Sequence, residues 1–227
     1  MSSIDGRLIV DRWTAPAAGI KAETLRGHYD EIASRFESDG WIVGRKTMQE
    51  LIEGEARTVK SSGGDLRSTY IANRKGRDVA VSIDPHGKLH YGRDNIADDH
   101  IIAVLGEEVS DNYLAELRED GVSYLFAGPD GSDLGGALKM LGEVFGLKIL
   151  LLEGGGRING AFLKEGLIDE ISLLVYPAID GLAGVPAIFD YAGLGDELPG
   201  TGQSLRHIGT ETLEGGTVWL RYRVEKA

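Results

Sequence analysis

Three consecutive glycines between an acid and a base, Glu153-Gly154-Gly155-Gly156-Arg157, form the stretch of this sequence best suited to binding an anion. The apolar run before it, residues 148–152, predicts a buried strand, and residues 157–165 predict a helix. A helix that begins after glycines exposes backbone N–H groups, and its dipole favours negative charge at that end. Glycine also lets a pyrophosphate or a flat ring approach the backbone, because it has no Cβ. The alternative is an ordinary tight turn between a strand and a helix.

A second junction between a strand and a helix carries Gly44-Arg45-Lys46-Thr47. Residues 41–44 predict a short buried strand, and residues 47–53 predict a helix with Thr47 as its N-cap. The helix dipole disfavours a cation at this end by roughly 0.3–1 kcal/mol. A bound anion would explain why two cations stand there. A solvated basic turn is the other interpretation.

Two carboxylates are candidates for contact with a substrate. Glu153 ends an apolar run, where a carboxylate costs free energy unless it is paired or lies in a solvated cleft. A role in substrate binding or proton handling accounts for that position. Asp5 precedes Gly6, a pairing that is also common in simple turns.

The elements that would position these residues alternate along the chain. Short apolar runs predict further strands at residues 79–83, 101–105, 122–127 and 170–177. Amphipathic patterns predict helices at residues 22–37, 110–120 (capped by Ser110) and 132–145. This alternation predicts an α/β fold with a mostly parallel sheet flanked by helices.

The remaining segments complete the predicted fold. Residues 54–78 predict a long surface loop, and residues 84–92 a turn into another short strand. Residues 204–212 and 217–224 predict a C-terminal antiparallel hairpin, which we expect to make the sheet mixed. No linker or repeat divides the chain, so we expect one domain over residues 1–227.

Composition narrows the function. The 227 residues include no cysteine, which excludes a disulfide framework, a thiolate metal site and a cysteine nucleophile. The five histidines are scattered, so we expect no metal site. A net charge of −12 would repel nucleic acid. Without a membrane-length apolar run or a signal-peptide pattern, we expect a cytoplasmic protein that acts on a small molecule.

The two glycine motifs together resemble dihydrofolate reductase. Three further stretches are similar to its relatives, the riboflavin-biosynthesis pyrimidine reductases of the RibD C-terminal domain family. These stretches are Ser3-Ile4-Asp5-Gly6-Arg7, the acid ahead of the triple glycine, and Gly166-Leu167-Ile168-Asp169-Glu170. The resemblance runs from about residue 3 to about residue 190 and implies a dihydrofolate-reductase-like fold.

The resemblance also implies a cofactor and roles for single residues. It implies that NADPH phosphates bind Gly44, Arg45, Lys46 and Thr47, and that Ser82 lies near the adenosine ribose or its 2′-phosphate. It implies that Gly154, Gly155, Gly156 and Arg157 bind the pyrophosphate and nicotinamide side, and that Asp5 and Glu153 face the substrate. Two adjacent cations favour NADPH over NADH, whereas Asp84 near the ribose would favour NADH.

The reaction implied by the resemblance is hydride transfer from NADPH to a carbon–nitrogen double bond of a pyrimidine-type substrate, such as a ribosylamino-pyrimidinone phosphate. A homodimer is expected by analogy with relatives. Without cysteine the chain lacks the zinc deaminase of bifunctional relatives, so we expect the reductase half alone. Only Met1 and Ser2 precede the Ser-x-Asp-Gly segment, where the family has a complete strand, so we expect either that the true N-terminus is missing or that the first strand is trimmed.

Other functions stay open at this point. One is a true dihydrofolate reductase, which would bind dihydrofolate tightly. Another is a reductase of the same fold that acts on a different small molecule. A third, from a different class, is a nucleotide-binding protein without catalysis.

Overall fold

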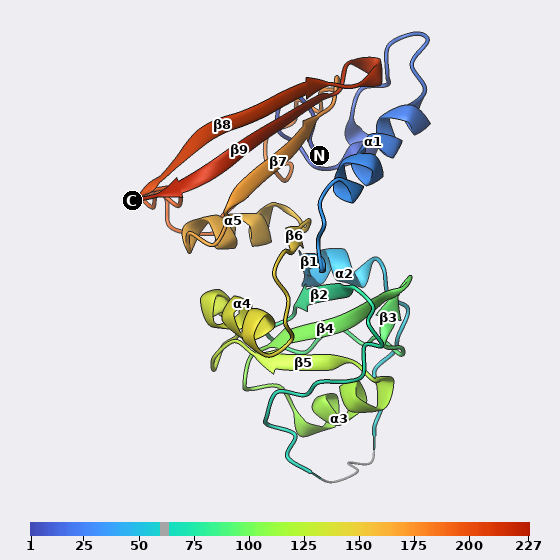
Figure 1. Ribbon diagram of the computed structural model, residues 1–227, viewed down its shortest axis with the longest axis vertical. Helices are drawn as coiled ribbons and strands as arrows, with labels where there is room; N and C mark the ends of the chain where they lie inside the picture. Colours follow the sequence, from blue (N-terminus) through green and yellow to red (C-terminus); the bar gives the residue numbers. More distant parts are fainter. Residues whose placement is uncertain (60–63) are drawn as a thin grey trace. The chain divides into compact units, whose positions relative to one another are not determined.

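The computed structural model describes residues 1–59 and 64–227 and divides into two compact units (Figure 1). The central unit is Ser38–Gly154, and the terminal unit joins Met1–Glu37 to Gly155–Ala227. Each unit contains one β-sheet. The expectation of one domain over residues 1–227 stays a prediction.

The central unit is built on a mostly parallel sheet with the strand order β3-β4-β2-β1-β6, and β5 also pairs with β4. Its strands are β1 (Gly40–Gly44), β2 (Val79–Ile83), β3 (Asn95–Ile96), β4 (Asp99–Leu105), β5 (Ser123–Phe126) and β6 (Leu151–Leu152). Only β3 runs antiparallel to its neighbour within this sheet. The mixed, mostly parallel α/β fold is therefore confirmed, although β3 rather than the hairpin makes this sheet mixed.

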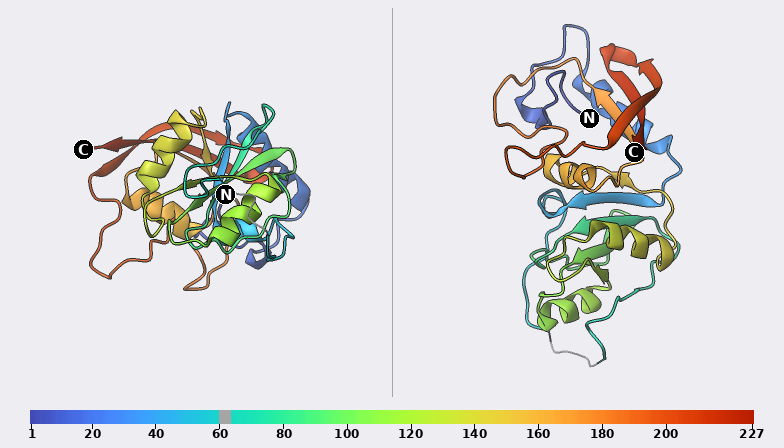
Figure 2. Two further views of the ribbon diagram at one scale, coloured as in Figure 1. Left: turned by 90° about the horizontal axis from the view of Figure 1, so that it is seen from below. Right: turned by 90° about the vertical axis from the view of Figure 1, so that its left-hand side faces the viewer.

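Helices bury both faces of the central sheet, which is why its strands are apolar at successive positions. β2 is buried along its whole length. Helix α3 (Asp111–Asp120) belongs to the same apolar cluster as Ala80 and Ile101. Helix α4 (Leu134–Glu143) connects β5 back to β6, and a right-handed crossover in that direction places it on the opposite face (Figure 2).

The sequence predicts N-caps for two helices of the central unit, and one of the two is confirmed. Ser110 caps α3 by accepting a hydrogen bond from the backbone N–H of Tyr113, as the sequence predicts. The predicted N-cap at Thr47 is wrong. Helix α2 (Arg45–Gln49) begins directly after Gly44, which has extended backbone angles, so Thr47 lies inside the helix.

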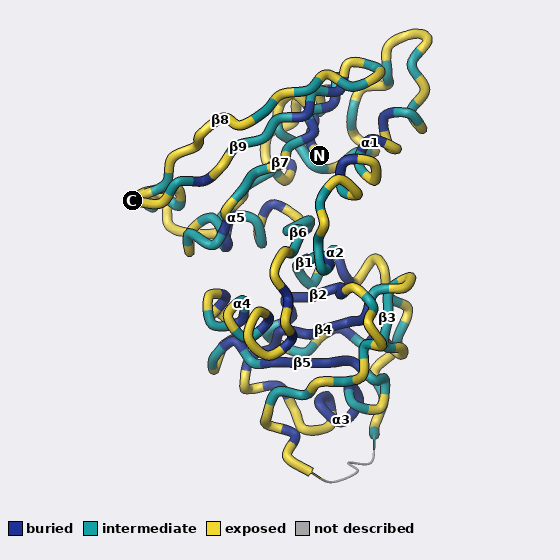
Figure 3. Tube along the Cα trace, in the orientation of Figure 1, coloured by how far each residue is buried: buried dark blue, intermediate teal, exposed yellow. Residues whose placement is uncertain are grey.

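The terminal unit holds a three-stranded antiparallel sheet in the order β7-β9-β8. Its strands are β7 (Glu170–Val175), β8 (Gln203–Thr212) and β9 (Val218–Lys226). The predicted hairpin is thus confirmed as β8 and β9, which are joined through a short 3-10 helix, η2 (Glu214–Gly216). It pairs with β7 rather than with the parallel sheet. β8 is exposed along most of its length (Figure 3).

Helices complete the terminal unit. Helix α1 (Ala22–Ser34) packs Leu25 and Ile32 against Leu174 and Trp219. A 3-10 turn, η1 (Val10–Arg12), precedes it, and helix α5 (Gly156–Lys164) follows the triple glycine. Ahead of Asp5, Ser2 forms one parallel bridge with Val175.

Two predicted segments differ from the structure. Residues 54–59 and 64–78 form no helix or strand, yet Leu66 is buried and Tyr70 bridges to Tyr124, so this part of the loop reaches the core. Residues 60–63 of that predicted loop lie outside the described residues. The strand expected within residues 84–92 is wrong, because the Asp84 carboxylate accepts the backbone N–H groups of Lys88 and Leu89 and holds a turn there.

The predicted strand at residues 148–152 is shortened to β6. The carboxylate of Asp39 accepts the backbone N–H groups of Lys148 and Ile149 at 2.6 and 2.9 Å, so this stretch is held by a side chain rather than by a strand. Among the helices in the described parts of the chain, none is long and apolar enough to cross a membrane.

Candidate active site

The two glycine motifs meet at the carboxyl ends of neighbouring parallel strands. Gly44 ends β1, and Glu153 follows β6, where its backbone N–H donates to the carbonyl of Ile42 at 3.0 Å. β1 is also where the strand order reverses, because β2, β4 and β5 follow on one side and β6 returns on the other. Open α/β sheets bind ligands outside the carboxyl ends of the strands at such a switch point. The position therefore suits a nucleotide or a similar ligand.

Gly154 makes this close approach possible. A Cβ at this residue would lie 2.6 Å from Val43 Cα and 2.7 Å from the backbone nitrogen of Gly44. Contacts this short do not occur in folded proteins, so the junction needs glycine. The first of the three glycines is thus explained by packing within the central unit.

The other two glycines belong to the terminal unit and have different reasons. Gly155 is exposed, caps α5 without a side chain, and has φ +24°, a region that L side chains rarely adopt. Gly156 is buried, and a Cβ there would lie 2.1 Å from the carbonyl oxygen of Ala187. The exposed glycine is therefore the one whose backbone is open to a ligand.

Three basic residues that the resemblance assigns to cofactor binding lie at helix starts: Arg45 and Lys46 begin α2, and Arg157 lies in the first turn of α5. Arg45 donates to the side chain of Gln49 at 3.0 Å, while Lys46 and Arg157 are exposed. Neither helix has an acidic residue in its first turn. Positive charge at these two helix starts therefore meets no carboxylate from the same first turn.

Asp5 lies in a turn of the terminal unit and holds a second turn. Its carboxylate accepts hydrogen bonds from the Ser3 hydroxyl at 2.6 Å and from the backbone N–H groups of Gly181 and Asp180 at 2.8 and 3.2 Å. The Ser3 hydroxyl and the Gly181 amide lower the pKa of Asp5 to about 2. The carboxylate is thus a permanent anion at neutral pH that fixes backbone.

Two predicted positions near the cofactor ribose turn out to be buried. Ser82 has no exposed surface, and its hydroxyl lies 2.6 Å from that of Tyr91. Asp84 is also fully buried and accepts the two turn amides described above. Burial raises the pKa of Tyr91. Both side chains are therefore used inside the central unit, and neither offers its polar atoms to solvent.

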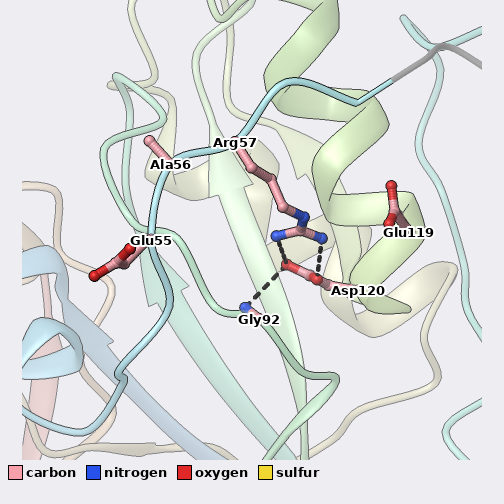
Figure 4. A pocket seen from close by; sticks show the side chains of 6 residues that line it. All are labelled: Glu55, Ala56, Arg57, Gly92, Glu119 and Asp120. Atoms are coloured by element: carbon pink, nitrogen blue, oxygen red, sulfur yellow. Dashed lines mark hydrogen bonds and ion pairs between the residues drawn. The ribbon is translucent and has the colours of Figure 1, made fainter.

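A cavity of the central unit lies away from these residues. It has a volume of about 610 Å³ and is lined by Glu55, Ala56, Arg57, Gly92, Glu119 and Asp120 (Figure 4). Arg57 and Asp120 form an ion pair across it at 2.5 Å. In the described part of the chain no three His, Asp or Glu side chains gather into a metal-binding group.

One segment without a predicted role borders both the Asp5 turn and helix α5 in the terminal unit. Residues 185–191 pair with the Asp5 turn, through the bridge between Arg7 and Ala187, and also contact the first turn of α5. The pattern offered no signal for this, since glycine and proline suggested only a loop. The one hint was Gly160, which follows Gly156 by one helical turn.

The fold and the strand-end position define an α/β protein with a candidate ligand site at the switch point of its sheet. Over residues 1–218 the chain matches the family described as RibD C-terminal domain, and it belongs to that family. The family resemblance drawn from the sequence is thereby confirmed.

Relatives of known name agree with this membership. The chain is 27% identical over 194 residues to the 2,5-diamino-6-ribosylamino-4(3H)-pyrimidinone 5′-phosphate reductase of Aquifex aeolicus, covering 82% of this chain and 78% of that protein. It is 25% identical to the riboflavin biosynthesis protein RibD of the same organism, over 70% of this chain but only 46% of RibD. The chain thus spans about half of that longer relative.

Among solved structures, a pyrimidine reductase-like protein from Corynebacterium diphtheriae aligns with a TM-score of 0.66 at 18% identity, covering 100% of this chain and 90% of that one. RibD from Acinetobacter baumannii aligns with a TM-score of 0.61 at 22% identity, covering 99% of this chain and 56% of that one. At such identities these likenesses establish the fold alone.

Proposed function

We propose that this chain is an NADPH-dependent reductase that transfers hydride to a pyrimidine-type substrate, such as a ribosylamino-pyrimidinone phosphate of riboflavin biosynthesis. Family membership and the printed activity of the Aquifex relative support this reaction class. The observation that carries the proposal is the meeting of Gly44 with Gly154 at the switch point of the parallel sheet.

The residues present fit a dinucleotide. In the central unit, Gly44 leaves backbone without a Cβ at the start of α2, where Arg45 and Lys46 add cations. In the terminal unit, Gly155 does the same at the start of α5, beside Arg157. NADPH, when bound, supplies the hydride. Thr47 is the third residue of α2 and adds a hydroxyl to the groups proposed to bind the phosphates.

NADPH rather than NADH is favoured by the same residues. Arg45 and Lys46 provide two cations for an extra phosphate. The acid that could have selected a free 2′-hydroxyl, Asp84, is buried and holds a turn. Ser82 is left out of the proposed contacts, because its hydroxyl is buried against Tyr91.

The two predicted acids receive different roles. Glu153 is half-buried at the end of β6, and we propose that it orients the substrate or handles a proton. Asp5 has its carboxylate occupied by Ser3, Asp180 and Gly181, so we propose that it shapes the substrate side by fixing the turn at residues 180–181.

The direct test is binding and turnover with purified protein. Melting temperatures are measured with NADPH, NADH, dihydrofolate and the diamino-ribosylamino-pyrimidinone phosphate, since ligands of the native state raise them. NADPH fluorescence then follows oxidation with each acceptor. We expect binding of NADPH and oxidation only with the pyrimidine. Oxidation with dihydrofolate would favour a folate reductase, and binding without any turnover would favour a nucleotide-binding protein.

By analogy with relatives, we also propose that the protein forms a homodimer and is located in the cytoplasm. Light scattering at several protein concentrations measures the oligomeric state. A monomer at all concentrations would contradict the dimer and leave the reductase proposal unaffected.

A further inference from the structure

Residues 185–191 contact both the turn that holds Asp5 and helix α5 in the terminal unit. The backbone N–H of Ile188 donates to the carbonyl of Gly6 at 3.1 Å, and the carbonyl of Ile188 accepts the side-chain Nδ2–H of Asn159 at 2.9 Å. On the Gly6 side, the N–H of Leu8 also donates to Pro186 at 3.1 Å. The segment therefore runs between the Asp5 turn and helix α5.

The contact with α5 is made almost directly between backbones. Gly156 and Gly160 lie one helical turn apart, so they share a face of the helix with Asn159. A Cβ at Gly156 would lie 2.1 Å from Ala187 O, and one at Gly160 would lie 2.5 Å from the backbone nitrogen of Tyr191. The carbonyl of Gly156 also accepts the N–H of Asp190 at 2.9 Å.

This arrangement couples the segment to the first turn of the helix. Because no side chain lies between them, a displacement of residues 185–191 is not absorbed by a rotamer change. It is passed to Gly156 and to the adjacent Gly155, whose unusual φ of +24° depends on how the first turn is held. Asn159 is the side chain of this face that hydrogen-bonds to the segment.

We infer that Asn159 is a positioning residue: through Ile188 it holds residues 185–191 against α5, and so keeps the Gly155–Arg157 turn in the conformation that binds the cofactor phosphates. The inference rests on the proposed function. Asn159 is half-buried and three residues into the helix, and it acts through backbone rather than on the reacting atoms. Its Oδ1 is buried without a partner among the described residues, so the amide is held by its donor.

The test separates holding the cofactor turn from general stability. Asn159→Ala removes the donor, and Asn159→Asp keeps the shape but places an acceptor against Ile188 O. We expect each to weaken NADPH binding about tenfold, as loss of one hydrogen bond to a fixed group does. The KM for NADPH should rise with it, while kcat at saturating NADPH stays within about twofold.

A second variant reaches the same contact by another route. Gly160→Ala inserts a methyl group against Tyr191 and should weaken NADPH binding in the same direction. Its control is Gly142→Ala in α4, where the nearest atom to the added Cβ is Leu147 O at 3.6 Å. Asn112→Ala is the control for the side chain, since Asn112 ties Arg57 and Val59 to α3 in the central unit in a similar manner.

Dissociation constants come from NADPH fluorescence titration, and far-UV circular dichroism verifies the fold of each variant. If Asn159→Asp and Gly160→Ala are folded and bind NADPH as the wild type does, the inference is overturned while the reductase proposal stands. The same holds if the two control variants weaken binding equally. Absence of NADPH binding by the wild-type protein would overturn both.

Discussion

The carboxylate of Asp5 accepts the backbone N–H of Gly181 at 2.8 Å, across 176 residues of sequence. The same carboxylate also accepts hydrogen bonds from the Ser3 hydroxyl and the Asp180 backbone N–H, so Asp5 holds the turn after β7 in place. The consequence is a pH dependence of stability, because a carboxylate held by three donors resists protonation.

Asp5→Asn should therefore destabilise the protein most near neutral pH. The pKa of Asp5 falls from 3.8 in the unfolded chain to about 2 in the fold. A lowered pKa stabilises the fold above the unfolded value, and this contribution is lost as pH falls through the folded one. Urea unfolding from about pH 6 to about pH 2 should thus show the wild type and the variant converging, with the change concentrated below about pH 4. Asp98→Asn, at an exposed position, is the control, and a constant difference at all pH values would contradict the assignment.

Ser82→Ala should lower stability without affecting the cofactor. The buried Tyr91 hydroxyl loses its hydrogen bond to Ser82, which costs about 1–3 kcal/mol. Adding Tyr91→Phe should recover part of this loss, because the orphaned hydroxyl is then gone. Chemical denaturation measures both effects, and NADPH titration should give an unchanged affinity. A weaker affinity would return Ser82 to the cofactor site.

Replacing Arg45 and Lys46 together by alanine should weaken NADPH binding by about 100- to 10,000-fold, since two charge-assisted hydrogen bonds contribute about 1.5–3 kcal/mol each. NADH should lose less, because it lacks the extra phosphate. Lys139→Ala, an exposed cation on α4 that pairs with Glu143, controls for net charge. Unchanged affinity for both cofactors would show that the phosphates bind elsewhere.

Glu153→Gln should lower kcat at least tenfold while NADPH affinity stays within about twofold, as expected for a group that serves the substrate in proton handling. Rapid-mixing measurements of the first turnover locate the effect in the chemical step. Loss of NADPH binding in a folded variant would instead move Glu153 to the cofactor side.

Gly154→Ala should destabilise the central unit by about 1–3 kcal/mol, because the added methyl group meets Val43 and Gly44 backbone. Gly27→Ala offers the opposite case. It lies within α1, with nothing within 4 Å of the added Cβ, and should stabilise the protein by about 0.5–1 kcal/mol. Thermal melts of the two variants should shift in opposite directions. Equal shifts would mean that the junction tolerates a side chain.

Local pattern was sufficient for most elements of this protein. The apolar runs that became β1, β2 and β4, the Ser110 cap of α3 and the C-terminal hairpin each depend on neighbours in sequence, so the printed residues predict them. The motifs at Gly44 and at Gly154 were also legible, since strand, glycine and helix follow each other directly.

Only the tertiary structure decided what individual polar residues do. Asp84 and Ser82 stand at the end of a strand, where sequence suggests a ligand, and burial against Lys88 and Tyr91 makes them structural. Asp39 shortens β6 from more than a hundred residues away in the chain. Contacts of this kind join residues that share no local pattern, and the free energy of burial depends on the whole fold.

The same reason applies to the triple glycine. The sequence determined that residues 154–156 could approach an anion, because glycine lacks a Cβ. The fold gives each glycine a different environment: Gly154 packs against Gly44, Gly156 packs against Ala187, and Gly155 is exposed. Which glycine meets a ligand is set by what each Cα faces, and that follows from the packing of distant segments.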